Sequence, residues 1–238
     1  YENFSGIALD GYKNSDAISE ILFNAANFFD AESSVIVYLR RQDHFLESLY
    51  AQYIKQGKSW GFNEFLSMFD SSSFNWEVLV SNYSKWFGIN NIKIGLYEKS
   101  RLIGGDLIKD FSSKIGYELE QLDFIGKNNG YSREALEVAR ICNDTFEPND
   151  KKKLRALLQA TNYKNPFETY SLFDSIDERY EFLVKYENSN VKIGMLLDNP
   201  LAFQVEGNVL DSSFDGLQQN DIIRVVMRAL IECQRKKK

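Results

Sequence analysis

The clearest pattern in the chain is a change from continuous to periodic apolar residues between Val35 and Tyr53. Residues 35–39 (VIVYL) form an uninterrupted apolar run, which predicts a strand buried on both faces. From Asp43 onward the apolar residues recur every three or four positions, which predicts a helix. Arg40 and Arg41 separate the two segments. Ligands of open parallel sheets gather beyond the carboxyl ends of the strands, which is where these arginines fall.

The same patterns predict further elements on both sides of this segment. Ser15 or Asp16 is expected to cap a helix that presents an apolar face from Ile18 to Phe29. A short helix at 62–69, a helix at 76–87 that ends at Gly88, a strand at 91–97 and a helix at 107–115 are expected to follow. The remainder is predicted to be almost wholly helical, with pieces at 135–142, 154–158, 180–184 and 222–231.

Only two strands, 34–39 and 91–97, are convincing, and two strands cannot form a sheet covered on both faces. Either further strands escape recognition or their partners precede Tyr1. The expected fold class is therefore α/β, with an incomplete parallel sheet and a mostly helical C-terminal half.

Composition narrows the class of protein. With 238 residues, 44% of them apolar and 14% aromatic, the chain is long and apolar enough for one substantial core. The formal net charge of −6 disfavours nucleic acid and anionic membranes as partners, and no apolar run is long enough for a membrane span. Cys142 and Cys233 fit no metal or redox spacing, which favours a reducing, cytoplasmic location. His44 is the single histidine, which excludes a multi-histidine metal site.

Arg40 and Ser48 are eight residues apart, and Tyr50 completes a Ser-x-Tyr pattern. A guanidinium at a strand end and a hydroxyl two turns along the next helix can converge on one phosphate group. Here the chain resembles the PAPS-dependent sulfotransferase superfamily, whose 3′-phosphate motif is Arg-x-x-x-x-x-x-x-Ser-x-Tyr after a buried strand. It is most similar to bacterial sulfotransferase-like and carbohydrate sulfotransferase proteins, with a nearly unbroken match from Tyr38 to Tyr53.

The resemblance implies a P-loop-NTPase-like sulfotransferase fold over residues 1–203, with a loop and helix at 204–238 packed on the same domain. It implies that Arg40 and Ser48 bind the 3′-phosphate of PAPS (3′-phosphoadenosine 5′-phosphosulfate), and that Glu2 is the candidate catalytic base. The acceptor is then a hydroxyl or amine of a carbohydrate or small metabolite. No segment matches the family's 5′-phosphosulfate loop, so an upstream segment on the same polypeptide is expected to supply it, and the chain alone is expected to be inactive.

Other residues near the motif are expected to have structural roles or to contact a ligand in a minor way. Arg41 is expected either to be solvated or to pair with Asp43, and His44 is expected to be a helix-start residue and not a base. Trp60, in a glycine-flanked loop, is the tryptophan that best suits a ligand contact. The alternative function is a non-catalytic sulfotransferase-like module that serves binding or assembly in a larger polysaccharide-modifying protein.

Overall fold

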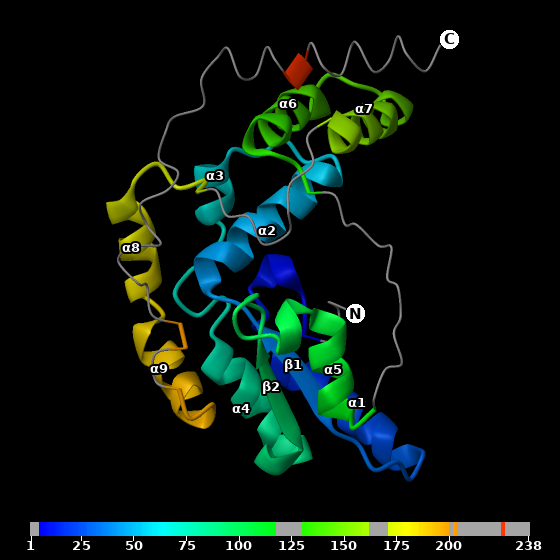
Figure 1. Cartoon of the computed structure of the whole chain (residues 1–238), viewed down its shortest axis with the longest axis vertical. Helices are drawn as coiled ribbons and strands as arrows, with labels where there is room; N and C mark the ends of the chain where they lie inside the picture. The colour runs from blue at the N-terminus through cyan, green and yellow to red at the C-terminus, as the bar shows by residue number, and fades with distance from the viewer. Residues whose placement is uncertain (1–4, 118–129, 162–170, 200–201, 204–224, 227–238) are drawn as a thin grey trace. The chain divides into compact units, whose positions relative to one another are not determined.

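The computed structural model of the chain describes residues 5–117, 130–161, 171–199, 202–203 and 225–226 (Figure 1). These residues form a mixed α/β structure that is mostly helical and contains a small two-stranded parallel sheet. The chain divides into two compact units, each made of three stretches of sequence. The first unit contains Tyr1–Asp43, Ser67–Asp123 and Tyr180–Val205, and the second contains His44–Leu66, Phe124–Arg179 and Glu206–Lys238.

The elements follow the predicted order. The strands are β1 (Val35–Leu39) and β2 (Ile92–Leu96). The α-helices are α1 (Ser15–Phe28), α2 (Gln42–Lys55), α3 (Phe62–Leu66), α4 (Trp76–Phe87), α5 (Leu107–Ile115), α6 (Arg133–Asn143), α7 (Pro148–Thr161), α8 (Ile176–Val184) and α9 (Glu187–Leu196). Short 3₁₀ turns lie at Ala8–Asp10, Ile89–Asn91 and Ile103–Gly105.

The sheet of the first unit pairs β1 with β2 in parallel, in a register that runs from Val35 opposite Ile92 to Leu39 opposite Leu96. The two predicted strands are therefore confirmed. The prediction that β1 is buried on both faces is wrong, because only Leu39 is buried and the four preceding residues are half-buried. Among the described residues β1 has a partner on one edge only, so it lacks the second neighbour that would complete its burial.

One face of the sheet meets α5, as Figure 1 shows beside the two arrows. The Tyr38 hydroxyl donates a hydrogen bond to Asp110 Oδ2 at 2.6 Å, and burial together with this bond raises the pKa of Tyr38. The strand partner of Tyr38 is Gly95, where a Cβ would lie 2.5 Å from a ring carbon of Tyr38. Because glycine has no side chain, position 95 leaves room for the Tyr38 ring, which any larger residue would contact too closely.

The other layer is built on α4, which contacts both strands and packs against α1 and α9. The predicted span of α4 and its end at Gly88 are confirmed, and the Asn75 side chain caps its first turn by accepting from Val78 N–H. The core of this layer consists mainly of buried side chains of β1, α4 and the preceding loop: Leu39, Phe74, Trp76, Leu79, Val80 and Tyr83. This core supports the carboxyl end of β1.

The apolar face predicted for α1 is misplaced. Phe28 and Phe29 are 83% and 75% exposed, whereas Ser19 is buried against α4 and donates to Asn82 O. Phe23 supplies the aromatic contact, with its ring 5.7 Å from that of Trp86. The predicted caps are also wrong, since Ser15 is the first helical residue and the cap position is Asn14, whose side chain makes no capping bond.

The second unit is organised around most of α2, whose buried residues include Leu46, Tyr50 and Ile54. The Tyr50 ring packs 5.5 Å from that of Phe65, and α6 and α7 pack against each other. Asn143 donates hydrogen bonds to the Ile54 carbonyl at 2.8 Å and to the Lys58 carbonyl at 2.7 Å, which satisfies the chain where α2 ends. Of the helix predicted at 222–231, the described residues 225 and 226 are helical and the others lie outside the described residues.

Candidate functional site

The turn between β1 and α2 is fixed from several directions within the first unit. We call residues 40–43 the basic turn. The indole Nε1 of Trp76 donates to the Arg40 carbonyl at 2.8 Å. The buried side-chain amides of Gln42 and Asn190 exchange two hydrogen bonds, of 2.9 and 3.0 Å. The basic turn therefore has a defined backbone, as a ligand-binding turn requires.

Arg41 and Asp43 form a buried ion pair inside this turn. Arg41 Nε and Nη2 donate to the two carboxylate oxygens of Asp43, each at 2.8 Å. The two side chains are 6% and 0% exposed. The predicted pairing is confirmed and the solvated alternative is wrong, because this guanidinium is turned into the protein and neutralised there. The pair leaves Arg40 as the residue of the turn that is half-buried and not enclosed.

Arg40 lies directly beyond the carboxyl end of β1, as predicted. Its guanidinium carbon is 5.6 Å from the centre of the Tyr97 ring, a cation–π distance. The Tyr97 N–H donates to the Leu39 carbonyl at 2.7 Å, which continues the pairing of the strands by one residue. Arg40 is thus held over the end of β2 while part of its surface stays open to solvent.

Charged side chains converge at this edge of the sheet. We call Arg40, Arg41, Asp43, Glu98 and Arg101 the strand-end cluster. Glu98 interacts electrostatically with the other four members. Burial raises the pKa of the Glu98 carboxyl, an effect that the three arginines oppose and Asp43 reinforces. Three guanidinium groups and two carboxylates leave the cluster one net positive charge, which suits an anionic ligand.

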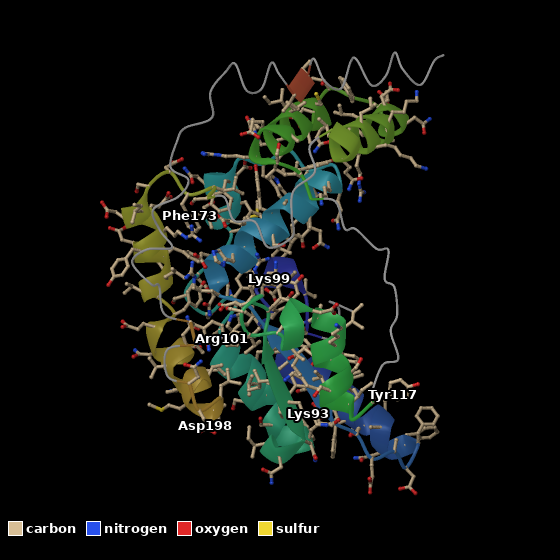
Figure 2. The ribbon with its side chains drawn as sticks, viewed as in Figure 1. Lys93, Lys99, Arg101, Tyr117, Phe173 and Asp198 are labelled. Carbon is tan, nitrogen blue, oxygen red and sulfur yellow. The ribbon has the colours of Figure 1, made fainter. Side chains whose placement is uncertain are left out.

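Figure 2 marks three cations along this part of the chain: Lys93 within β2, and Lys99 and Arg101 on the segment after it. Lys93 is used structurally, since its Nζ donates to the Lys114 carbonyl at 2.6 Å. Lys99 and Arg101 are exposed and lie where β2 ends. Positive residues that are exposed or half-buried therefore follow the carboxyl ends of both strands.

The other two predicted site residues are less closely defined. Ser48 lies on α2, where its side chain is exposed. Arg40 belongs to the first unit and Ser48 to the second, so each is placed within its own unit. Glu2, the predicted base, lies outside the described residues.

The secondary candidates have structural roles. His44 is half-buried in the first turn of α2, as expected of a helix-start residue. Trp60 stacks on Phe65 at 6.3 Å between ring centres, and its carbonyl accepts a hydrogen bond from the Tyr50 hydroxyl at 2.8 Å. Burial raises the pKa of Tyr50 to about 12, which keeps this hydroxyl a donor. Trp60 is therefore used in the packing of the second unit.

A cavity of about 370 Å³ lies on the α1 and α4 side of the sheet. Its wall is mainly apolar and includes Leu22, Val80 and Phe87, with the hydroxyls of Ser33 and Ser34 before β1. Three consecutive residues of β1, 35–37, line it, and their side chains alternate in direction, so the cavity borders the edge of the strand. None of the described residues that line it is charged, in contrast to the strand-end cluster.

The described residues include no group of three or more histidine, cysteine, aspartate or glutamate side chains placed to hold a metal ion. None of their helices combines the length and the apolar character that crossing a bilayer requires.

Comparison with known proteins identifies an archaeal relative. The chain is 28% identical over 166 residues to an uncharacterized protein of Archaeoglobus fulgidus, and the match covers 68% of this chain and 45% of that protein. The chain thus corresponds to less than half the length of this relative. No family model and no solved structure matches the chain.

The sequence singled out neither Glu98 nor Arg101 of the strand-end cluster as a site residue. The available signal for Glu98 was its position, because an acidic residue two positions after a parallel strand falls at the same edge as Arg40. Its proximity to the arginines depends on the register of the two strands, which the hydrophobic pattern of either strand alone does not specify.

Proposed function

We propose that this chain carries the 3′-phosphate-binding part of a PAPS-dependent sulfotransferase with a P-loop-like fold. The observation that supports the proposal best is the position of Arg40, a half-buried residue on an anchored turn between a parallel strand and a helix. A planar, permanently charged fork of donors at the carboxyl end of a strand suits a phosphate monoester. The resemblance of residues 38–53 to the sulfotransferase motif is the reason for proposing this family.

In this proposal Arg40 binds the 3′-phosphate through charge-assisted hydrogen bonds. The hydroxyl of Ser48 donates a further hydrogen bond to the same phosphate. Ser48 is exposed on α2, so its hydroxyl is accessible to a ligand. The buried Arg41–Asp43 pair holds the turn and contacts no ligand. Glu2 would deprotonate the acceptor, a hydroxyl or amine of a carbohydrate or small metabolite.

Sulfuryl transfer also requires donors for the 5′-phosphosulfate, and the sequence contains no glycine-rich phosphate loop to provide them. We therefore expect the 238-residue chain to bind the nucleotide but not to turn over PAPS. The same observation favours the second candidate function, a sulfotransferase-like module that binds and does not catalyse. If a longer polypeptide that contains such a loop transfers sulfate, the protein is a sulfotransferase and not a non-catalytic module.

The test is calorimetric titration of the chain with adenosine 3′,5′-bisphosphate. Adenosine 5′-monophosphate and adenosine 2′,5′-bisphosphate are the controls, the first without the extra phosphate and the second with the same charge in another position. The proposal predicts clearly tighter binding of the 3′,5′-compound than of either control. Equal affinity for the two bisphosphates would show only general attraction to charge, and would contradict a 3′-phosphate site.

A further inference from the structure

The outer edge of β1 has backbone groups that bond to no described residue. The sheet order is β1–β2, so among the described residues β1 has a neighbour on one side only. Successive residues of a strand direct their N–H and C=O groups to opposite sides of the strand. The Leu39 carbonyl accepts from Tyr97 N–H, so the backbone of Leu39 is directed toward β2. The alternation then directs the backbone groups of Ile36 and Tyr38 away from β2. Such an edge is a template for pairing with a further strand.

The cavity of about 370 Å³ lies beside this edge. The Tyr38 hydroxyl bonds to Asp110 of α5 on one face of the sheet, so the side chain of Val37 is directed to the opposite face, where α4 contacts the strand. α1 packs against α4 and contributes Leu22 and Ala26 to the cavity wall. The two helices and the strand edge therefore border a space that no described strand fills. Its volume falls in the range of ligand pockets, about 300–1,000 Å³.

The charges around this space restrict what can enter it. None of the described residues that line the cavity is charged. Asp30 and Glu32 are exposed and lie just before β1 in the chain. An extended chain spans at most about 3.6 Å per residue, so Glu32 lies within about 11 Å of Val35, where β1 begins. The edge therefore suits a segment that is apolar toward the cavity and basic at the end beside Glu32.

We propose that the open edge of β1 binds an extended segment of another protein chain by strand addition. The backbone of the segment forms hydrogen bonds with the N–H and C=O groups of Ile36 and Tyr38. Every second side chain of the segment is aliphatic and enters the cavity against Leu22 and Ala26. A lysine or arginine at the end of the segment lies beside Glu32. This inference is independent of the proposed function.

A single strand suits this edge better than a second copy of the chain does. A copy that paired antiparallel through its own β1 would bring its own α1 to the same side of the sheet. There, α1 and α4 of the first molecule already line the cavity. Each copy also has a formal net charge of −6, so two copies repel each other. An isolated segment brings neither a helical layer nor this charge.

The experiment uses the 238-residue chain and a short synthetic peptide in which leucine and threonine alternate between terminal lysines. Amide hydrogen exchange measured by NMR reports on the backbone of β1, and fluorescence anisotropy of the labelled peptide gives the affinity. Two control peptides are N-methylated, one at the leucines and the other at the threonines, so that each loses the N–H groups of one edge. A third control has terminal glutamates in place of the lysines.

In the free chain we expect the amide of Ile36 to exchange faster than that of Val37, which faces β2. The lysine peptide, at about ten times its dissociation constant, should slow the exchange of Ile36 about tenfold. A strand pairs through one edge, so one N-methylated peptide should bind at least about tenfold more weakly and the other as well as the parent peptide. The glutamate peptide should bind several-fold more weakly, because it places like charge beside Glu32.

A matched pair of variants tests the cavity. Ala26→Leu fills it, whereas Ala25→Leu adds the same side chain at an exposed position of the same helix. We expect Ala26→Leu to weaken binding of the lysine peptide several-fold and Ala25→Leu to leave it unchanged. If Ala26→Leu fails to fold, the exchange measurements on wild type decide alone.

The contrary results are equally specific. Slow exchange of Ile36 in the free chain would show that the edge is already paired, and a dimer in sedimentation would identify a second copy as the occupant. Unchanged affinity of both N-methylated peptides would show that the cavity takes apolar side chains without strand pairing. No binding of the lysine peptide up to about 1 mM, or equal weakening by Ala26→Leu and Ala25→Leu, would also overturn the proposal.

Discussion

The Arg41–Asp43 pair gives a sharp test of how the basic turn is held. Asp43→Asn keeps the size of the side chain but removes the charge that neutralises Arg41, and both side chains are almost fully enclosed at 6% and 0% exposure. Removing one partner of a buried ion pair costs about 3–5 kcal/mol, because the remaining charge stays desolvated. The asparagine oxygen can still accept one hydrogen bond, so we expect a loss of about 3 kcal/mol in the free energy of unfolding.

The matched control is Asp16→Asn, which removes the same charge from the Lys85–Asp16 pair in the same unit. The side chains of that pair are 59% and 53% exposed, so its loss should cost less than about 1 kcal/mol. Urea unfolding followed by tryptophan fluorescence reports on this region, because Trp76 bonds to the Arg40 carbonyl. If Asp43→Asn costs no more than Asp16→Asn, the pair is not enclosed as described and the reasoning fails.

Three further predictions concern the same edge of the sheet. Trp76→Phe should lower the free energy of unfolding in urea by about 1 kcal/mol more than Trp86→Phe does. The reason is that Trp76 Nε1 donates to the Arg40 carbonyl, whereas Trp86 Nε1 has no partner among the described residues. Equal losses of unfolding free energy would contradict this. Ser48→Ala should change stability by less than about 0.5 kcal/mol yet weaken adenosine 3′,5′-bisphosphate binding several-fold, as expected of an exposed ligand contact; unchanged affinity would remove Ser48 from the site. Glu98→Gln should stabilise the free protein at neutral pH. Because burial raises the pKa of Glu98 in the folded protein, the neutral carboxyl stabilises the fold below the ordinary glutamate pKa, and this stability is lost as pH rises through the folded-state pKa. The advantage of glutamine should therefore disappear near pH 4, where the carboxyl of wild type is protonated in the folded protein. Urea curves at the two pH values check this, and a pH-independent difference would be the contrary result.

Local patterns predicted the elements well. The apolar run of β1, the four-residue spacing of α2 and the helix from Trp76 to Gly88 each depend on neighbours in sequence, so the sequence indicated their bounds to within one or two residues. The position of Arg40 at a strand end followed from the same information. These features need no knowledge of tertiary contacts.

What failed depends on contacts between distant residues. The α1 face that packs on α4 contains Ser19, whose buried hydroxyl is satisfied by the Asp16 and Asn82 carbonyls. A count of apolar positions therefore selects the wrong side of the helix and buries Phe28. The enclosure of Arg41 depends equally on elements far along the chain, since the neighbouring Gln42 is held by Asn190, which is 148 residues away.

The central claim is that Arg40 on the basic turn recognises a 3′-phosphate. The most direct measurement compares the affinities of Arg40→Ala, Arg40→Lys and wild type for adenosine 3′,5′-bisphosphate and for adenosine 5′-monophosphate. Lys109→Ala, an exposed cation on α5 of the same unit, is the charge-matched control. We expect wild type and Lys109→Ala to prefer the bisphosphate equally. Arg40→Lys should keep part of that preference, and Arg40→Ala should lose about 10- to 100-fold of it with little change in binding of the monophosphate. A preference that survives in Arg40→Ala, or falls equally in Lys109→Ala, would contradict the account.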